Sequence, residues 1–197
     1  MNRLSTLFQF AFGSWKNKEV ILIVSSGRTG TNFMADWFKK VAPQVVSLHE
    51  PQPDLFYLGV NRFRKNYSQF KTYIKLKWAR AGYLSHLQKH NKKVYIESNP
   101  NLVLLLPAAK QLFPNLKIIF IKRDLKDYLI SAFNKSPDKS ETNFYYADND
   151  PRKRLTAIDV NNNPNTIDGW NKLGREERIA WWWYFANKQI EGYLFRG

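Results

Sequence analysis

A turn with two glycines is the segment of the sequence with the clearest chemical meaning. It reads Ser26-Gly27-Arg28-Thr29-Gly30-Thr31-Asn32 and lies between an apolar run and an amphipathic helical pattern. Gly27 and Gly30 can adopt positive φ, so successive backbone N–H groups can point at one anion, and a helix beginning near Thr31 adds its dipole. Arg28 contributes a fixed cation and the threonines contribute hydroxyl donors. The turn therefore predicts a phosphate-binding loop, with an ordinary threonine-capped turn as the alternative.

A second group suited to phosphate follows the fourth apolar run, which ends in Lys122-Arg123-Asp124. A guanidinium at a strand end and the hydroxyl of Ser131, eight residues further on, could grip one phosphate. A nucleoside triphosphatase would need the phosphate-loop motif GxxxxGK[ST], but Thr and Asn follow Gly30 here. Such an enzyme would also have an acid at the end of the strand that organises Mg²⁺, where this chain has a cation. The alternative is an exposed arginine with a serine bonded to its own helix.

A general base could come from His49-Glu50-Pro51, which follows the second apolar run. In a parallel sheet this position lies at the edge where ligands bind, and either side chain could accept a hydroxyl proton. Glu97 is a further candidate base. The alternative for His49 and Glu50 is a purely structural role in capping a turn. HExxH zinc chemistry does not apply because Pro53 stands where the second histidine would be. His86 and His90, among lysines, are expected to be solvated.

These groups would be positioned by strands that alternate with helices. Four short runs are apolar nearly throughout, as buried parallel strands are: Val20–Ser25, Gln44–Leu48, Lys93–Glu97 and Lys117–Lys122. Helical patterns separate them, at Thr31–Val41, within 55–90 and at Leu102–Phe113. Alternating strands and helices predict an α/β fold with a central parallel β-sheet flanked by helices.

The remaining segments predict an arm, a loop and a final helix. Residues 1–18 form an N-terminal helical arm whose apolar side chains follow Arg3 at helical spacing, expected to pack back on the domain or to contact a membrane interface. Residues 134–168, rich in Asn and Pro, predict a lid-like loop. Arg175–Tyr193 predicts a helix whose aromatic cluster Trp181–Phe185 packs in the core. No apolar run is long enough to span a membrane.

The amino-acid composition limits the kinds of chemistry and of binding partner that the protein can have. The 197 residues predict one domain, 1–197, and zero cysteines exclude disulfides and thiolate chemistry, which suits a cytoplasmic location. Lys plus Arg is 31 and Asp plus Glu is 16, and the net charge of +15 attracts anionic partners.

Residues 55–96 carry ten cations and no acid, and their aromatic and aliphatic residues recur every three or four positions. We expect one buried face there and a cationic one that either is merely solvated, attracts an anionic acceptor, or contacts anionic lipid. The recurring residues are Phe56, Val60, Phe63, Tyr67, Phe70, Ile74 and Trp78.

Together these motifs resemble the carbohydrate and bacterial-type sulfotransferases that use 3′-phosphoadenosine 5′-phosphosulfate (PAPS). The likeness is carried by the Ser26 to Thr31 loop, the spacing of Arg123-Asp124 to Ser131, and Glu97-Ser98-Asn99-Pro100. It implies a P-loop-like sulfotransferase fold and transfer of a sulfuryl group to a hydroxyl of a glycan or a lipid-linked sugar, without a metal. It also implies that Ser26 to Asn32 hold the 5′-phosphosulfate and that Arg123 and Ser131 grip the 3′-phosphate.

The resemblance assigns the base to Glu50, with His49 as alternative, and charge stabilisation to Arg28. Three positions differ from common family residues: Arg28 replaces a lysine, as in the carbohydrate-modifying branch, Ser98 replaces a lysine, and Leu125 replaces a proline. Family members continue past the tryptophan-bearing helix, so we expect the C-terminal part to be missing. A P-loop kinase or other nucleotide-binding protein remains an alternative. A basic nucleic-acid-binding module would not explain two phosphate grips at strand ends, so no nucleic acid is expected.

Overall fold

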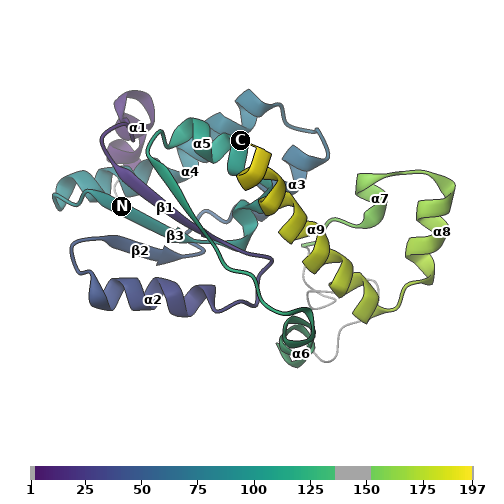
Figure 1. Ribbon diagram of the computed structural model, residues 1–197. Helices are drawn as coiled ribbons and strands as arrows, with labels where there is room; N and C mark the ends of the chain where they lie inside the picture. The colour runs from purple at the N-terminus through teal and green to yellow at the C-terminus, as the bar shows by residue number, and fades with distance from the viewer. Residues whose placement is uncertain (1–2, 136–151, 197) are drawn as a thin grey trace. The chain divides into compact units, whose positions relative to one another are not determined.

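The chain consists of two compact units, residues Met1–Ile121 and Lys122–Gly197. The computed structural model describes residues 3–135 and 152–196. Each unit is described by itself. The first carries the sheet and the predicted phosphate loop, and the second is helical in the residues described (Figure 1).

The first unit is built on a sheet of four parallel strands in the order β2-β3-β1-β4. The strands are β1 (Glu19–Val24), β2 (Val46–His49), β3 (Val94–Ser98) and β4 (Leu116–Phe120). β1 lies between two neighbours, and most of its side chains are buried, which is why its sequence does not alternate. The predicted α/β fold with a parallel sheet is confirmed.

Helices cover both faces of this sheet (Figure 1). They are α1 (Arg3–Phe12), α2 (Thr31–Val41), α3 (Phe56–Phe63), α4 (Gln69–Lys89), the 3₁₀ helix η1 (Pro100–Leu104) and α5 (Leu106–Leu112). The helix α2 lies on one face, and α4 and α5 lie on the other, as right-handed crossovers in opposite directions along the sheet require. All four strands therefore point their carboxyl ends at one edge.

The buried face of α4 differs from the predicted one. Thr72, Leu76, Arg80, Leu84 and Leu87 are buried, whereas the predicted core residues Phe70 and Trp78 are exposed. The helix is interrupted at residues 64–68, and α4 begins again after Ser68, whose side chain accepts a hydrogen bond from the backbone N–H of Lys71. The prediction was wrong because it treated residues 56–78 as one continuous helical pattern, whereas the new start at Ser68 changes which side chains of α4 face the core.

The second unit contains α6 (Leu125–Lys135), α7 (Ala157–Val160), α8 (Pro164–Lys172) and α9 (Arg175–Arg196). The prediction of a continuous lid-like loop over 134–168 was therefore wrong at the end of α6, at α7 and at the start of α8. The part of this prediction that falls on 136–151 lies outside the described residues. Asn163 accepts from the backbone N–H of Thr166, and Pro164 occupies the first helical turn. The Asn-Pro pair that suggested a loop is thus a helix start.

The tryptophans of α9 pack within the second unit. Trp182 is buried, and the guanidinium carbon of Arg154 lies 4.3 Å from its ring centroid. Trp183 donates its indole N–H to the backbone oxygen of Arg123 at 2.9 Å. Tyr184, in contrast, is exposed. Within its own unit the cluster is therefore partly buried, through Trp182 and Phe185, and its packing against the sheet stays a prediction.

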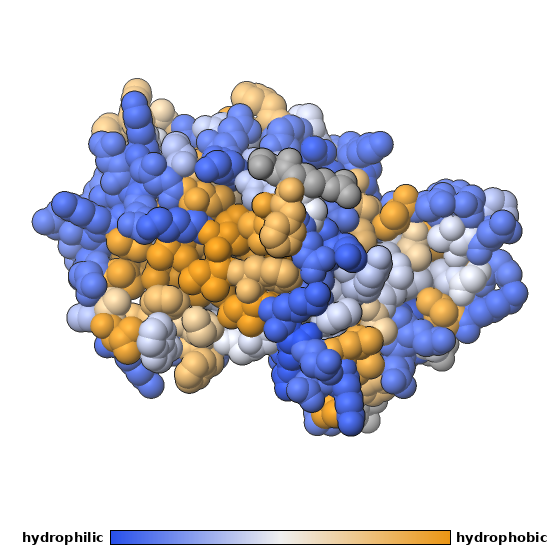
Figure 2. All heavy atoms as spheres, viewed as in Figure 1, coloured by the Kyte–Doolittle hydropathy of each residue, from blue (hydrophilic) through white to orange (hydrophobic). Residues whose placement is uncertain are grey.

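The surface holds one broad apolar area on the face in view, over β4 and α2 (Figure 2). Three exposed residues of α2 recur at helical spacing: Phe33, Trp37 and Val41. Within the two described ranges, 3–135 and 152–196, we find no helix with both the length and the hydropathy needed to cross a bilayer.

Candidate functional site

The glycine turn forms a loop at the carboxyl end of β1. Gly27, Arg28 and Gly30 have φ of 92°, 55° and 81°. A Cβ on Gly30 would meet no heavy atom within 4 Å, so the backbone angle, and not the space, requires glycine there. Gly30 caps α2 without any side-chain hydrogen bond. The N-cap residue therefore provides no capping side chain of its own for the first-turn N–H groups of α2, an arrangement that suits an anion.

Buried serine side chains hold this loop in place. Ser25 and Ser26 are fully buried, and Ser25 Oγ accepts from the backbone N–H of Gly27 at 3.0 Å. Ser98, at the end of β3, donates its hydroxyl to the backbone oxygen of Thr31 at 2.6 Å. The start of α2 is thus tied to the neighbouring strand, so the loop is held rigidly at the sheet edge.

His49 and Glu50 lie at the same edge, beside β3. The carbonyl oxygen of Ser98 accepts both the backbone N–H of Glu50 and the Nδ1 of His49, each at 3.0 Å. Since a carbonyl only accepts, Nδ1 of His49 carries a proton, and in the neutral ring Nε2 is the free base. Nε2 lies 3.8 Å from Oε1 of Glu50, whose side chain is 43% exposed. Either group can therefore receive a proton, and the choice between them stays open.

Glu97, the third candidate base, is instead held in a buried ion pair. Its two oxygens accept from Arg80 Nη2 at 2.6 Å and Nε at 2.7 Å, from Tyr95 Oη at 2.8 Å and from Asn99 Nδ2 at 2.9 Å. Burial lowers the pKa of Arg80, but the adjacent carboxylate more than offsets this and the net pKa is raised. Burial, and then the charge of Glu97, raise the pKa of Tyr95. With four hydrogen bonds, Glu97 serves structure and not proton transfer.

Arg80 also holds the segment that follows the candidate base. Its Nη1 donates to the backbone oxygen of Pro53 at 3.2 Å, and Tyr83 Oη donates to that of Gln52 at 2.7 Å. Arg80 is one of the ten cations of residues 55–96 that were expected on an exposed face, and for Arg80 this prediction was wrong because the side chain is fully buried. The signal was present: Arg80 stands in the stripe Leu76, Arg80, Leu84, and an acid sits within the apolar third strand.

Arg123 and Ser131 belong to the second unit. Arg123 precedes α6, and its backbone oxygen is held by Trp183 as described above. Asp124 accepts from the backbone N–H of Lys126, so it caps the start of α6. Ser131 is half-buried within that helix. The structure thus brings together the loop, His49, Glu50 and Ser98 in the first unit, whereas the 3′-phosphate grip stays a prediction for the second.

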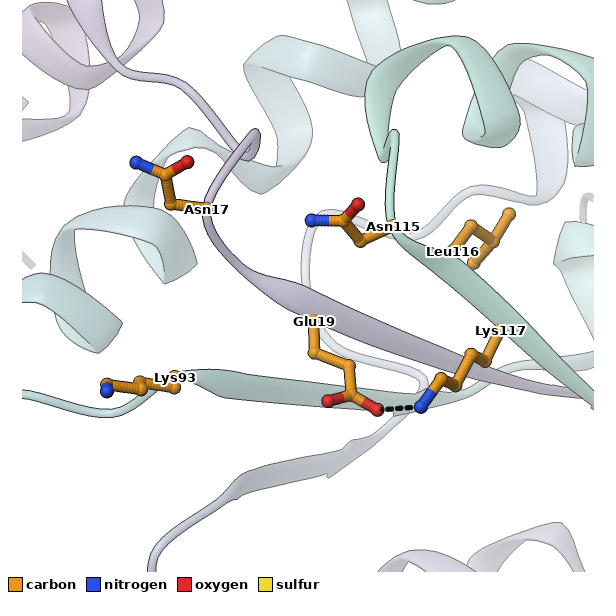
Figure 3. A pocket seen from close by; sticks show the side chains of 6 residues that line it. All are labelled: Asn17, Glu19, Lys93, Asn115, Leu116 and Lys117. Atoms are coloured by element: carbon orange, nitrogen blue, oxygen red, sulfur yellow. Dashed lines mark hydrogen bonds and ion pairs between the residues drawn. The ribbon is translucent and has the colours of Figure 1, made fainter.

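Two other features are separate from this edge. His86 and His90 are exposed, with ring centroids 4.4 Å apart, and the described residues hold no cluster of three potential metal-ligating side chains. A hollow at the amino ends of the strands contains the ion pair of Glu19 and Lys117 (Figure 3). Its lining residues are Asn17, Glu19, Lys93, Asn115, Leu116 and Lys117. It lies at the sheet edge opposite to the glycine loop.

Comparison with known proteins adds no relative. No protein-family model, no curated protein and no solved structure matches the chain.

Proposed function

We propose that this protein is a sulfotransferase that moves a sulfuryl group from PAPS to a hydroxyl of an acceptor, and that its fold is the P-loop-like fold of that family. The observation that carries the proposal is the Ser25 to Thr31 loop, in which three positive-φ residues precede a helix whose first turn has no side-chain cap. Such a loop suits the phosphosulfate end of the donor. The absence of a P-loop lysine in its sequence argues against an ordinary nucleoside triphosphatase.

The reaction needs alignment and charge stabilisation more than covalent chemistry by the protein. The acceptor oxygen forms a bond to sulfur while the bond between sulfur and the bridging phosphate oxygen breaks, releasing adenosine 3′,5′-bisphosphate. The N–H groups of the loop and the guanidinium of Arg28 stabilise the negative charge that develops on the leaving phosphate. The acceptor proton passes to Glu50, or to Nε2 of His49, both held beside the loop by Ser98.

The remaining roles rest on the resemblance. Arg123 and Ser131 would bind the 3′-phosphate, which distinguishes this donor from ATP. The acceptor would be a glycan or a lipid-linked sugar that carries negative charge, because exposed cations such as Lys71 and Lys75 line α4.

The proposal is tested by calorimetric titration of the whole protein with adenosine 3′,5′-bisphosphate, ATP and a DNA duplex. The expected result is binding of the bisphosphate that neither ATP nor DNA displaces. Preference for ATP would favour a P-loop kinase, and preference for DNA would favour a nucleic-acid-binding module. Transfer of labelled sulfate from PAPS to a panel of glycans, lipids and phenols then identifies the acceptor. Bisphosphate binding without transfer to any of them would contradict the enzymatic part of the proposal.

A further inference from the structure

Helix α1 directs most of its apolar side chains away from the unit on which it packs. Its contact with α4 is made by Phe10, whose ring meets Trp78 edge-on at 4.6 Å, and by Gln9, which donates to Gln88 at 2.6 Å. The opposite face is apolar and exposed: Leu4 74%, Leu7 50%, Phe8 60% and Phe12 77%. A helix of a globular domain normally turns such a stripe inward.

The exposed side chains form one continuous surface. Leu4, Phe8 and Phe12 follow each other at successive helical turns, and the rings of Phe8 and Phe12 lie 5.3 Å apart. A contiguous apolar surface of this kind indicates contact with a partner.

The surroundings of this face are cationic. Residues 1–18 and 55–96, which include both α1 and α4, contain no Asp or Glu. Arg3, Lys16 and Lys89 are exposed, and Nζ of Lys77 lies 5.4 Å from the ring centroid of Phe10.

Two further groups add no net negative charge to these surroundings. The acid that follows along the chain, Glu19, is ion-paired with Lys117. Partial burial, and then the charges of His90, Lys89 and Lys92, lower the pKa of His86 on α4. A partner of the α1 face must therefore offer both an apolar environment and negative charge.

We propose that the exposed face of α1 docks on the surface of an anionic lipid bilayer. The helix would lie in the interfacial plane, with its leucine and phenylalanine side chains among the upper acyl chains and the bordering cations against lipid head groups. Aromatic and apolar residues bordered by Lys and Arg are the composition that this environment favours.

The docking surface is separate from the candidate catalytic edge and does not depend on the proposed activity. The helix α1 packs on α4 as far as Gln88, close to the amino ends of the strands, whereas the phosphate loop and Glu50 lie at their carboxyl ends (Figure 1). A second copy of the chain is a poorer occupant. A two-fold contact through this face would bring Arg3 and the lysines of both copies together with no acid to pair them.

The test is sedimentation of the whole protein with vesicles of phosphatidylcholine alone and of phosphatidylcholine with about 30% phosphatidylserine. We expect binding to the mixed vesicles that weakens as NaCl rises from about 0.05 M to about 0.5 M. The variant Phe8→Ser with Phe12→Ser should lower partitioning by at least about tenfold, since each ring would leave the interface. The matched control is Tyr184→Ser with Phe195→Ser, two exposed aromatic residues of the second unit, and it should bind like the wild type.

A charge variant separates the two contributions. Lys16→Gln with Lys89→Gln should lower binding to mixed vesicles by about fivefold for each cation and leave the weak binding to pure phosphatidylcholine unchanged. The proposal is overturned if the wild-type protein ignores mixed vesicles, or if Phe8→Ser with Phe12→Ser binds them normally while circular dichroism shows an intact fold. A dimer that this same variant converts to a monomer would assign the face to self-association instead.

Discussion

Replacing Arg80 by methionine should be among the most destabilising single changes in the first unit. Arg80 and Glu97 are both fully buried, and their bidentate contact supplies two of the four hydrogen bonds to the carboxylate. Arg80→Met leaves a buried charge with only Tyr95 and Asn99 as partners. Removing one member of such a pair costs about 3–5 kcal/mol. For a protein of this length that corresponds to a fall in melting temperature of about 6–20 °C.

The measurement is thermal and urea unfolding followed by far-ultraviolet circular dichroism. Lys75→Met on the same helix is the control, and its exposed side chain should change stability by less than about 0.5 kcal/mol. Combining Arg80→Met with Glu97→Gln removes the unpaired charge, so the double variant should lose less stability than the sum of the single losses. A loss below about 1 kcal/mol for Arg80→Met, or strict additivity in the double variant, would refute the buried ion pair as the support of this edge.

The proposed chemistry makes four further predictions. Arg28→Ala should weaken binding of adenosine 3′,5′-bisphosphate by about 10–150-fold in calorimetry, the worth of a charge-assisted contact of about 1.5–3 kcal/mol; unchanged affinity would remove Arg28 from the donor site. Glu50→Gln should keep that affinity and lower kcat by about 10²–10⁴-fold, whereas full activity in Glu50→Gln with loss in His49→Ala would transfer the base to His49. Lys71→Glu with Lys75→Glu should lower kcat/KM for an anionic acceptor and flatten its salt dependence, and unchanged kinetics would leave these lysines as a merely solvated face. Sulfuryl transfer should survive EDTA, and loss of activity on chelation would favour phosphoryl transfer.

The sheet could be predicted from the sequence because its strands are short runs that are apolar nearly throughout, and the two inner strands, β1 and β3, are largely buried. Each of the four strands begins and ends within two residues of the apolar run that predicted it, and α2 occupies the predicted Thr31–Val41. Apolar runs bounded by turn residues carry that information locally. The face of α4 could not be predicted in the same way, because a break at residues 64–68 changes which side chains a three-to-four-residue period brings together.

The candidate site was predicted as a set of positions but not as a network. The positive φ of Gly27 and Gly30 follows from local turn chemistry, so the loop was visible in the sequence. The pairing of Arg80 with Glu97 joins residues 17 positions apart through tertiary packing; the sequence shows each as a charged residue among apolar ones, but no local pattern says that they pair. It also removes Glu97 from the choice of bases, which the sequence alone left open.

Ser98 gives the two halves of the proposed reaction a common frame. Its hydroxyl holds the start of α2, and its carbonyl holds both His49 and the backbone of Glu50. A relative shift of donor and acceptor by about 1 Å can slow in-line transfer by about 10²-fold. Because the glycine loop and the proposed base are anchored to the same residue at the end of β3, a displacement of that strand would move both together. In the proposed reaction, the relative position of the leaving phosphate and the proton acceptor would thereby be better protected than by contacts to two independent elements.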